Sequence, residues 1–271
     1  SASYTLTGLT TGTAYYVAVA AVDSDGNQSW ISAEVSGTAA STPTDLALSA
    51  QPSNANAGSP LSSQLVVHVT DLEGNLVTSS SPSVTVSITS GSGTSGATLL
   101  GTTTVSAVDG VATFSDLQIY TAGEDYTLTV SSSGLTSIIS SAFDIAAGPA
   151  YKLVVATQPV ESAANDLFST QPVVQIQDDY GNLATSALAT VTASISSGLG
   201  NLTGILSVSA NAGVVTFTDL GIDSKGEDYQ LGFSSTGLSS ATSASFNMIS
   251  AIPVSLSFAK SPPGGGAGEA S

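Results

Sequence analysis

The sequence contains no cysteine and no arginine, and it has only three lysines and one histidine. The absence of cysteine excludes disulfide bonds, thiol catalysis and metal sites built on cysteine. Because three lysines cannot form a basic patch that neutralises phosphates, nucleic acid is excluded as a partner. No apolar run approaches the roughly 18 residues of a membrane-spanning helix, so direct insertion into a membrane is not expected.

Acidic residues dominate the few charges that are present. Twenty Asp and Glu residues give a formal net charge of −17, although charged residues make up only 8% of the chain. The hydrophobic share of 41% is nevertheless high enough for a folded protein with a real core. A length of 271 residues fits one large domain or two to three small ones.

The chain repeats itself in long, ordered matches. The segment GVATFSDL at 110–117 recurs as GVVTFTDL at 213–220, and GEDY at 123–126 recurs at 226–229. Earlier matches align with these once a short deletion is placed in the loop around residues 94–100. An internal repeat of this length indicates a tandem array of similar domains.

The matches predict four segments along the chain. Residues 1–41 differ from the repeats, residues 42–148 and 149–251 are the two full copies, and residues 252–271 resemble the start of a third copy. In that last segment PVSLSF at 253–258 parallels PTDLAL at 43–48. A flexible glycine-rich linker is the alternative for residues 252–271.

Apolar residues alternate with polar ones within each copy. Leu65, Val67 and Val69 share one face, while His68 is expected on the opposite, solvent-facing side. The same alternation follows Tyr126 and Tyr229, and turns rich in Gly, Asn, Asp and Ser separate the runs. This pattern predicts half-buried antiparallel strands, seven or eight per copy, and an all-β fold of tandem β-sandwiches.

The first 41 residues carry a different pattern. Leu9 and Tyr15 precede a strand of alternating apolar residues, a turn at 24–27 and a second strand from Trp30 to Ser36. This resembles the C-terminal half of a fibronectin type III domain. The resemblance implies a tyrosine corner, in which the Tyr15 hydroxyl bonds back to the upstream backbone. The first strands of that family are absent, so an apolar face is expected to be exposed.

The two copies carry a recurring signature over residues 43–251. It comprises LVV…QP at 153–159, PVVxIxDxxGN at 172–182, GxxTFxDL at 213–220 and GxxY at 226–229. These segments resemble the bacterial immunoglobulin-like repeats of large surface and secreted proteins. The resemblance implies sandwich modules in which Tyr126 and Tyr229 are structural, and an extracellular or cell-surface location.

Both ends of the chain fall inside expected modules. This predicts a piece of a longer multi-domain protein, whose neighbouring modules are its first partners. Alternatively, the segment containing Val254, Leu256 and Phe258 donates a strand to the incomplete first module of another copy. Such head-to-tail exchange would generate an oligomer or a filament.

Acidic turns are the candidate calcium sites. Asp23, Asp25 and Asn27 space their oxygens in a way that superficially resembles a calcium-binding loop. Each copy has a similar turn. The further candidates are Asp71 and Glu73 in the first copy and Asp178 and Asp179 in the second. The alternative is a plain β-turn that needs no metal, and no other cofactor is expected.

No pattern in the sequence predicts an enzyme. Glu124–Asp125 and Glu227–Asp228 are paired acids, but adjacent residues on a strand point to opposite faces, and these are expected in loops leading into strands. One histidine without a matching partner in the second copy cannot supply a catalytic triad. We therefore expect a non-catalytic structural or adhesive segment, a stalk or a fibre subunit. The alternatives are a spacer of a polysaccharide-degrading enzyme, or a module that binds glycans or host proteins.

Overall fold

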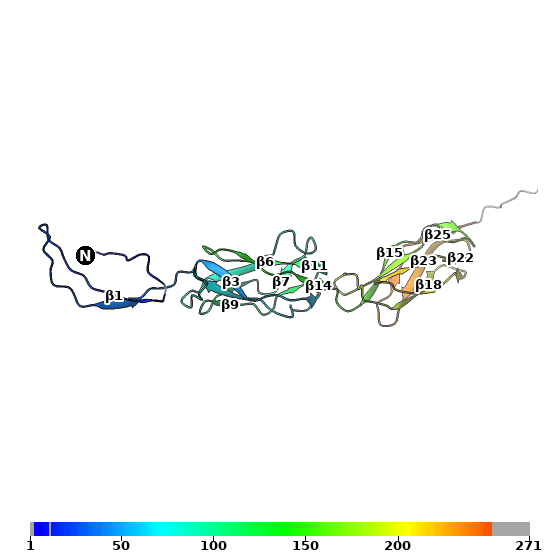
Figure 1. The fold of residues 1–271 in the computed structure, drawn as a ribbon. Coiled ribbons are helices and arrows are strands. Elements are labelled where there is room, and N and C mark those ends of the chain that lie inside the picture. Colours follow the sequence, from blue (N-terminus) through cyan, green and yellow to red (C-terminus); the bar gives the residue numbers. More distant parts are fainter. Residues whose placement is uncertain (1–2, 11, 251–271) are drawn as a thin grey trace, which may run out of the picture. The chain divides into compact units, whose positions relative to one another are not determined.

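Every regular element of the protein is a β-strand. The computed structural model describes residues 3–10 and 12–250, and none of these residues belongs to a helix, so none lies in a helix able to cross a membrane. The chain divides into two compact units, one up to Ala146 and one from Ala147 onward. Figure 1 shows the strands of each unit, and the fold of both is all-β.

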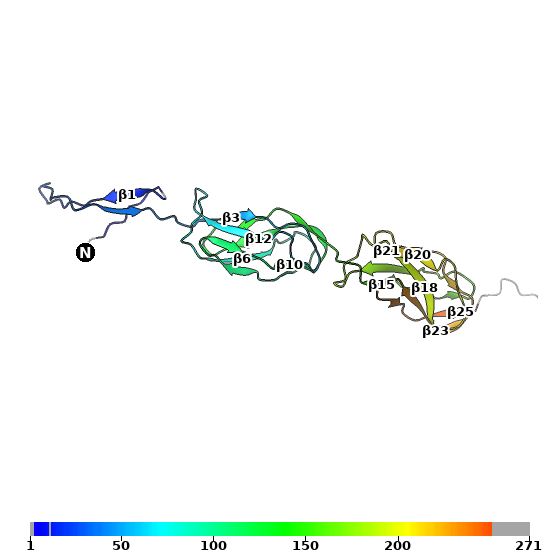
Figure 2. The same cartoon turned by 90° about the horizontal axis from the view of Figure 1, so that it is seen from below.

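The segment before Pro43 contains a two-stranded antiparallel sheet. Its strands are β1 (Ala14–Val17) and β2 (Val35–Thr38), paired from Ala14↔Thr38 to Val17↔Val35. In the two views of Figures 1 and 2 this described segment is drawn as extended chain, with no second layer packed on it. It therefore has half of the layers that a sandwich requires.

The first repeat is a β-sandwich of twelve described strands. They are β3 (Asp45–Ala50), β4 (Ala55–Asn56), β5 (Val66–Thr70), β6 (Ser83–Ile88), β7 (Leu99–Leu100), β8 (Thr104–Ser106), β9 (Val111–Thr113), β10 (Gln118–Ile119), β11 (Gly123–Tyr126), β12 (Leu128–Ser131), β13 (Ile138–Ile139) and β14 (Phe143–Ala146). The strands form the sheets β3-β5-β9, β13-β12-β6-β8 and β11-β14-β4 and the two-stranded sheet β10-β7. Side chains of these sheets meet in a single hydrophobic core.

The second repeat has the same plan. Its strands are β15 (Lys152–Thr157), β16 (Ser162–Ala163), β17 (Val173–Gln177), β18 (Thr190–Ser197), β19 (Leu202–Thr203), β20 (Ser207–Ser209), β21 (Val214–Thr216), β22 (Gly221–Ile222), β23 (Gly226–Ser234), β24 (Ala241–Thr242) and β25 (Phe246–Ile249). Its sheets are β15-β17-β21, β16-β25-β23-β18-β20 with β24 also paired to β23, and the two-stranded sheet β19-β22. Each repeat is thus a β-sandwich.

The predicted alternation is confirmed at the core positions. Leu65, Val67 and Val69 are fully buried, and Tyr126 and Tyr229 are buried as well. Their burial follows from the period of two, which turns every second side chain of a strand toward the core. The two copies also bury matching aromatic residues, Phe114 with Phe217 and Phe143 with Phe246.

Two expectations for polar residues need correction. His68 lies on the outer face of β5 between Ala47 and Val111, but it is half-buried rather than fully solvent-exposed. Glu124 and Asp125 lie within strand β11 and their counterparts within β23, not in loops. The pairing register shifts at this point, and Asp125 has φ = 57°, because a β-bulge places an extra residue in the strand.

Candidate functional site

Three turns with the sequence Asp-x-x-Gly-Asn contain all of the predicted calcium ligands. In each turn the backbone N–H of the Asn donates to Oδ1 of the Asp, at 2.8 Å for Asn27, Asn75 and Asn182 alike. The Asn side-chain Nδ2 donates to Oδ2 of the same carboxylate, at 2.8–3.3 Å. The glycine has a positive φ of 84–92°, which a residue without a Cβ adopts readily.

The three carboxylates differ in burial although their turns are alike. Asp71 and Asp178 are only 3% and 1% exposed, whereas Asp23 is exposed. Hydrogen bonds from Asn27 lower the pKa of Asp23. Burial of Asp71 and Asp178 opposes ionisation, but the hydrogen bonds they accept outweigh it and lower both pKa values. All three groups are therefore charged at neutral pH.

The calcium candidates do not form a cluster of acids. Asp25, Glu73 and Asp179 are exposed neighbours of the turn carboxylates. Among the described residues there is no group of three or more His, Asp or Glu that could hold a metal ion. The N–H of Asp25 and of Glu73 donates to the Asp at the start of its own turn. The arrangement stabilises turns, and a calcium role is a separate hypothesis.

Each module has a tyrosine whose hydroxyl bonds to the residue five positions earlier. The N–H of Thr10 donates to the Tyr15 hydroxyl at 2.8 Å, and this bond lowers the pKa of Tyr15. In the repeats, the Tyr126 hydroxyl donates to the Thr121 carbonyl at 2.9 Å, and the Tyr229 hydroxyl donates to the Ser224 carbonyl at 3.1 Å. These contacts fix a corner of the chain. Leu9 lies beside the first corner and is partly exposed, at 37%.

Recurring polar side chains that sequence reasoning missed also bind backbone. Gln64 Nε2 donates to the carbonyls of Leu61 and Leu117, and Gln171 repeats this pattern in the second repeat. Ser140 and Ser243 each accept a backbone N–H across the sheet, at 2.9 and 3.0 Å. The signal was present in the sequence, because both residue types recur at matching positions of the two copies.

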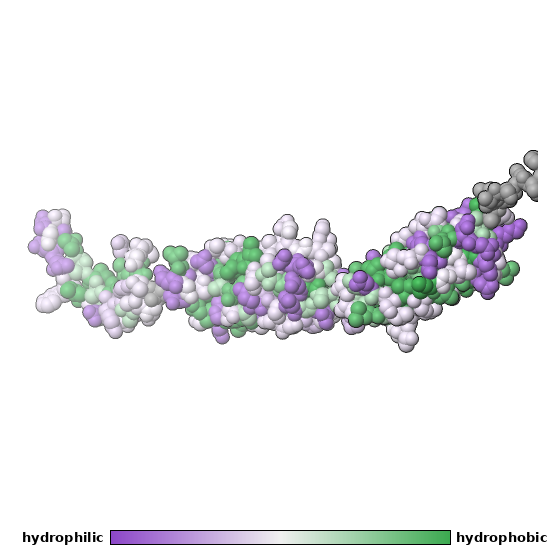
Figure 3. Space-filling view, turned by 45° about the vertical axis from the view of Figure 1, so that its right-hand side comes forward, coloured by the Kyte–Doolittle hydropathy of each residue, from purple (hydrophilic) through white to green (hydrophobic). Residues whose placement is uncertain are grey.

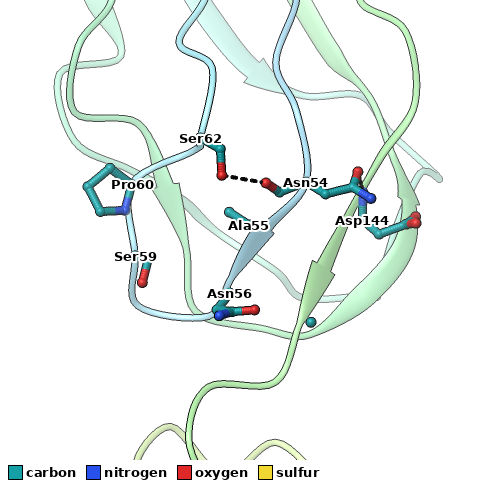
Figure 4. A pocket seen from close by; sticks show the side chains of 8 residues that line it. Asn54, Ala55, Asn56, Ser59, Pro60, Ser62 and Asp144 are labelled. Carbon is teal, nitrogen blue, oxygen red and sulfur yellow. Dashed lines mark hydrogen bonds between the residues drawn. The ribbon is translucent and has the colours of Figure 1, made fainter.

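An open cavity of about 540 Å³ lies beside strands β4 and β14 (Figure 4). It is lined by Asn54, Ala55, Asn56, Ser59, Pro60, Ser62, Asp144 and Ala146. The Ser62 hydroxyl donates to the Asn54 carbonyl, and Asn54 Oδ1 accepts the N–H of Asp144. Asp144 in turn accepts the N–H of Asp125 at 3.0 Å. Asp144 is the one acid among these lining residues, and Oδ1 of its carboxylate accepts the N–H of the bulge residue Asp125.

The N-terminal segment exposes large apolar side chains. Tyr4, Trp30 and Val35 are 89%, 98% and 71% exposed. Apolar residues are visible on the surface of this segment in Figure 3. The predicted strand-donating segment with Val254, Leu256 and Phe258 lies outside the described residues.

Comparison with known proteins gives a likeness of fold. No protein-family model matches the sequence, and no curated protein matches it. The Escherichia coli adhesin FdeC is 21% identical with a TM-score of 0.33, and the alignment covers 81% of this chain and 68% of that one. Invasin, a bacterial integrin-binding protein, is 19% identical with a TM-score of 0.29, over 73% and 38% of the two chains.

A glycosidase shows a likeness of similar size. The β-glycosidase from Bacteroides vulgatus is 12% identical with a TM-score of 0.32, and the alignment covers 77% of this chain. This chain spans about a quarter of the glycosidase's length.

Proposed function

We propose that this chain is a non-catalytic segment of an extracellular surface protein, acting as a stalk or as a fibre-forming, adhesive subunit. One observation carries the proposal. Three polar side chains that recur between the repeats, Gln64, Ser140 and Asp71, and their counterparts in the second repeat form hydrogen bonds with the backbone of their own repeat. A shared catalytic activity would require recurring polar groups that converge on an open site.

The proposed module organisation follows from the same repeats. Residues 1–41 are a half-module of fibronectin type III type, residues 42–148 and 149–251 are immunoglobulin-like repeats, and residues 252–271 begin a third repeat. The corner made by Tyr15 and Thr10 supports the first assignment. Strong negative charge supports an exposed location, because it keeps such modules soluble and apart.

Electron microscopy of the native material, with the intact mass of its polypeptide, tests the proposal. Fibres built from subunits near 26.6 kDa would identify a fibre subunit. A longer chain of beaded modules at the cell surface, labelled by antibody on intact cells, would identify a stalk. Recovery of the chain inside the cell, or attached to a polysaccharide-degrading domain that accounts for all activity, would contradict the surface role.

Strand exchange is the proposed route if the native material is fibrous. The apolar side chains exposed on the N-terminal segment require a covering layer, and Val254, Leu256 and Phe258 alternate as a strand would. Removing residues 252–271 is expected to abolish assembly. Fibres that form unchanged without this segment would contradict strand exchange and leave the surface role untouched.

A further inference from the structure

The buried carboxylate of Asp178 contacts the chain segment that enters its own repeat. Oδ2 of Asp178 accepts the backbone N–H of Gly148 at 2.8 Å, in a buried hydrogen bond. In the first repeat, Asp71 is buried in the matching turn, and Ser41 stands at the position equivalent to Gly148. The Ser41 side chain also helps to lower the pKa of Asp71. Asp23 receives its described hydrogen bonds from its own turn only.

A second contact holds each entering segment a few residues later. The N–H of Tyr151 donates to the carbonyl of Gln177 at 2.8 Å, and the N–H of Thr44 donates to the carbonyl of Thr70 at 2.9 Å. Between the two contacts the chain passes through a proline, Pro149 or Pro43, whose ring fixes φ. The entering backbone is therefore fixed at both ends of a short, stiff stretch.

The Asp178 contact has the features of a strong hydrogen bond. The acceptor is ionised and almost fully buried, and a hydrogen bond to a charged acceptor is stronger than one between neutral groups. Oδ2 also accepts a hydrogen bond from Asn182 Nδ2 at 2.8 Å, so this oxygen has two hydrogen-bond donors. Losing the Gly148 bond would leave a buried N–H without a partner, which is costly.

We propose that Asp71 and Asp178 are entry clamps that hold the linker onto the module it enters and thereby confine bending to residues before the clamp. The carboxylates that the sequence offers to calcium would then stiffen the joints through Ser41 and the Gly148 N–H, without a metal. This inference goes beyond the proposed function, because it concerns the joints of the chain whatever the modules bind.

Amide hydrogen exchange of Gly148 in the full 271-residue chain tests the clamp. Asp178→Asn keeps an oxygen for the Asn182 N–H but puts an NH₂ group where Oδ2 accepts two donors. We expect Gly148 to lose protection by about tenfold or more. Asn182→Ala is the matched control, because it removes the other donor to Oδ2 and leaves the clamp. Gly148 should stay protected in that variant, and equal loss in both variants would overturn the proposal.

A milder variant covers the case in which Asp178→Asn unfolds the second repeat. Ser41→Ala removes only the hydroxyl of Ser41, at the position equivalent to Gly148, and we expect faster backbone motion at residues 40–42 in ¹⁵N relaxation measurements. Asp23→Asn, in the matching exposed turn, should leave that motion unchanged. Unchanged motion in Ser41→Ala would contradict the clamp. A loss of Gly148 protection on adding calcium chloride would also contradict the clamp, because calcium would then bind Oδ2 of Asp178 in place of the Gly148 N–H.

Discussion

At the scale of single residues, a tyrosine hydroxyl in each module bonds to the backbone five residues earlier. The hydroxyl is the acceptor in one module and the donor in the other two. Tyr15 accepts a backbone N–H, whereas Tyr126 and Tyr229 donate to a backbone carbonyl. A hydroxyl can do either, since it carries one donor and two acceptor lone pairs. The spacing in sequence therefore predicts the contact for Tyr15, but the direction of the bond depends on which backbone group faces the ring.

Close packing on the tyrosine ring leads to a prediction for glycine. A Cβ added at Gly198 would lie within contact distance of the Tyr229 ring, and Gly198 also has φ = 113°. We expect Gly198→Ala to destabilise the second repeat strongly, by about 2–4 kcal/mol, from overpacking and backbone strain together. Gly237→Ala separates the two effects, because Gly237 has φ = 79° but open space around it. Equal losses in urea unfolding would show that the ring contact is unimportant.

The lowered pKa values of the turn carboxylates predict acid sensitivity. A carboxyl whose pKa is lower in the folded state contributes stability that is present above its ordinary pKa and is lost as the pH falls through the folded value. The pKa of Asp178 is lowered in this way, so its contribution should be lost as the pH falls below the ordinary carboxyl range and through the folded value. We expect Asp178→Asn to be less stable than wild type at pH 7, and the difference to shrink toward pH 3. Urea midpoints that differ equally at both pH values would contradict this.

At the scale of strands, the two repeats fill the same cross-strand site in different ways. Val86 pairs with Val130 across β6 and β12, whereas Ala193 pairs with Phe233 across β18 and β23. All four side chains are buried, at 2% exposure or less. Two side chains of medium size in one core thus correspond to a small and a large side chain in the other. This is expected when a core keeps its total side-chain volume rather than the identity of its residues.

A double-mutant cycle in the first repeat tests this compensation. Val130→Phe alone should overpack the core and cost about 1–3 kcal/mol. Val86→Ala alone should leave a cavity and cost about 2 kcal/mol. The double variant recreates the pair of the second repeat, and we expect a favourable coupling of about 1–3 kcal/mol in denaturant unfolding. Strictly additive losses would mean that the two side chains do not share one space.

The β-bulge in β11 marks the limit of strand prediction. Alternation correctly placed Tyr126 and Leu128 in the core, because the pleat gives every strand the same period. The acids before Tyr126 break that period, so the sequence favoured a loop. The structure instead keeps the strand and inserts an extra residue, since Asp144 accepts the N–H of Asp125 across the pair.

At the scale of the whole molecule, the N-terminal segment differs from both repeats in leaving its apolar side chains uncovered. Deleting residues 1–40, which keeps Ser41, should therefore reduce the binding of a hydrophobic dye such as ANS, while the unfolding midpoints of the two sandwiches stay the same. Leu72→Ser is the control, because it removes one apolar side chain, 80% exposed, from the first repeat. Dye binding that is unchanged by the deletion would show that these side chains are covered in solution.

The sequence alone determined the all-β class, the repeat and the inward faces of the strands, because these depend on local periodicity and on matches along the chain. It also predicted three similar turns at Asp23, Asp71 and Asp178. Tertiary structure decided that the last two carboxylates are buried and that Asp178 is bound to the entering chain, while Asp23 is exposed. Burial depends on what packs against a turn, and the partners here lie about 30 residues earlier, beyond the reach of any local pattern.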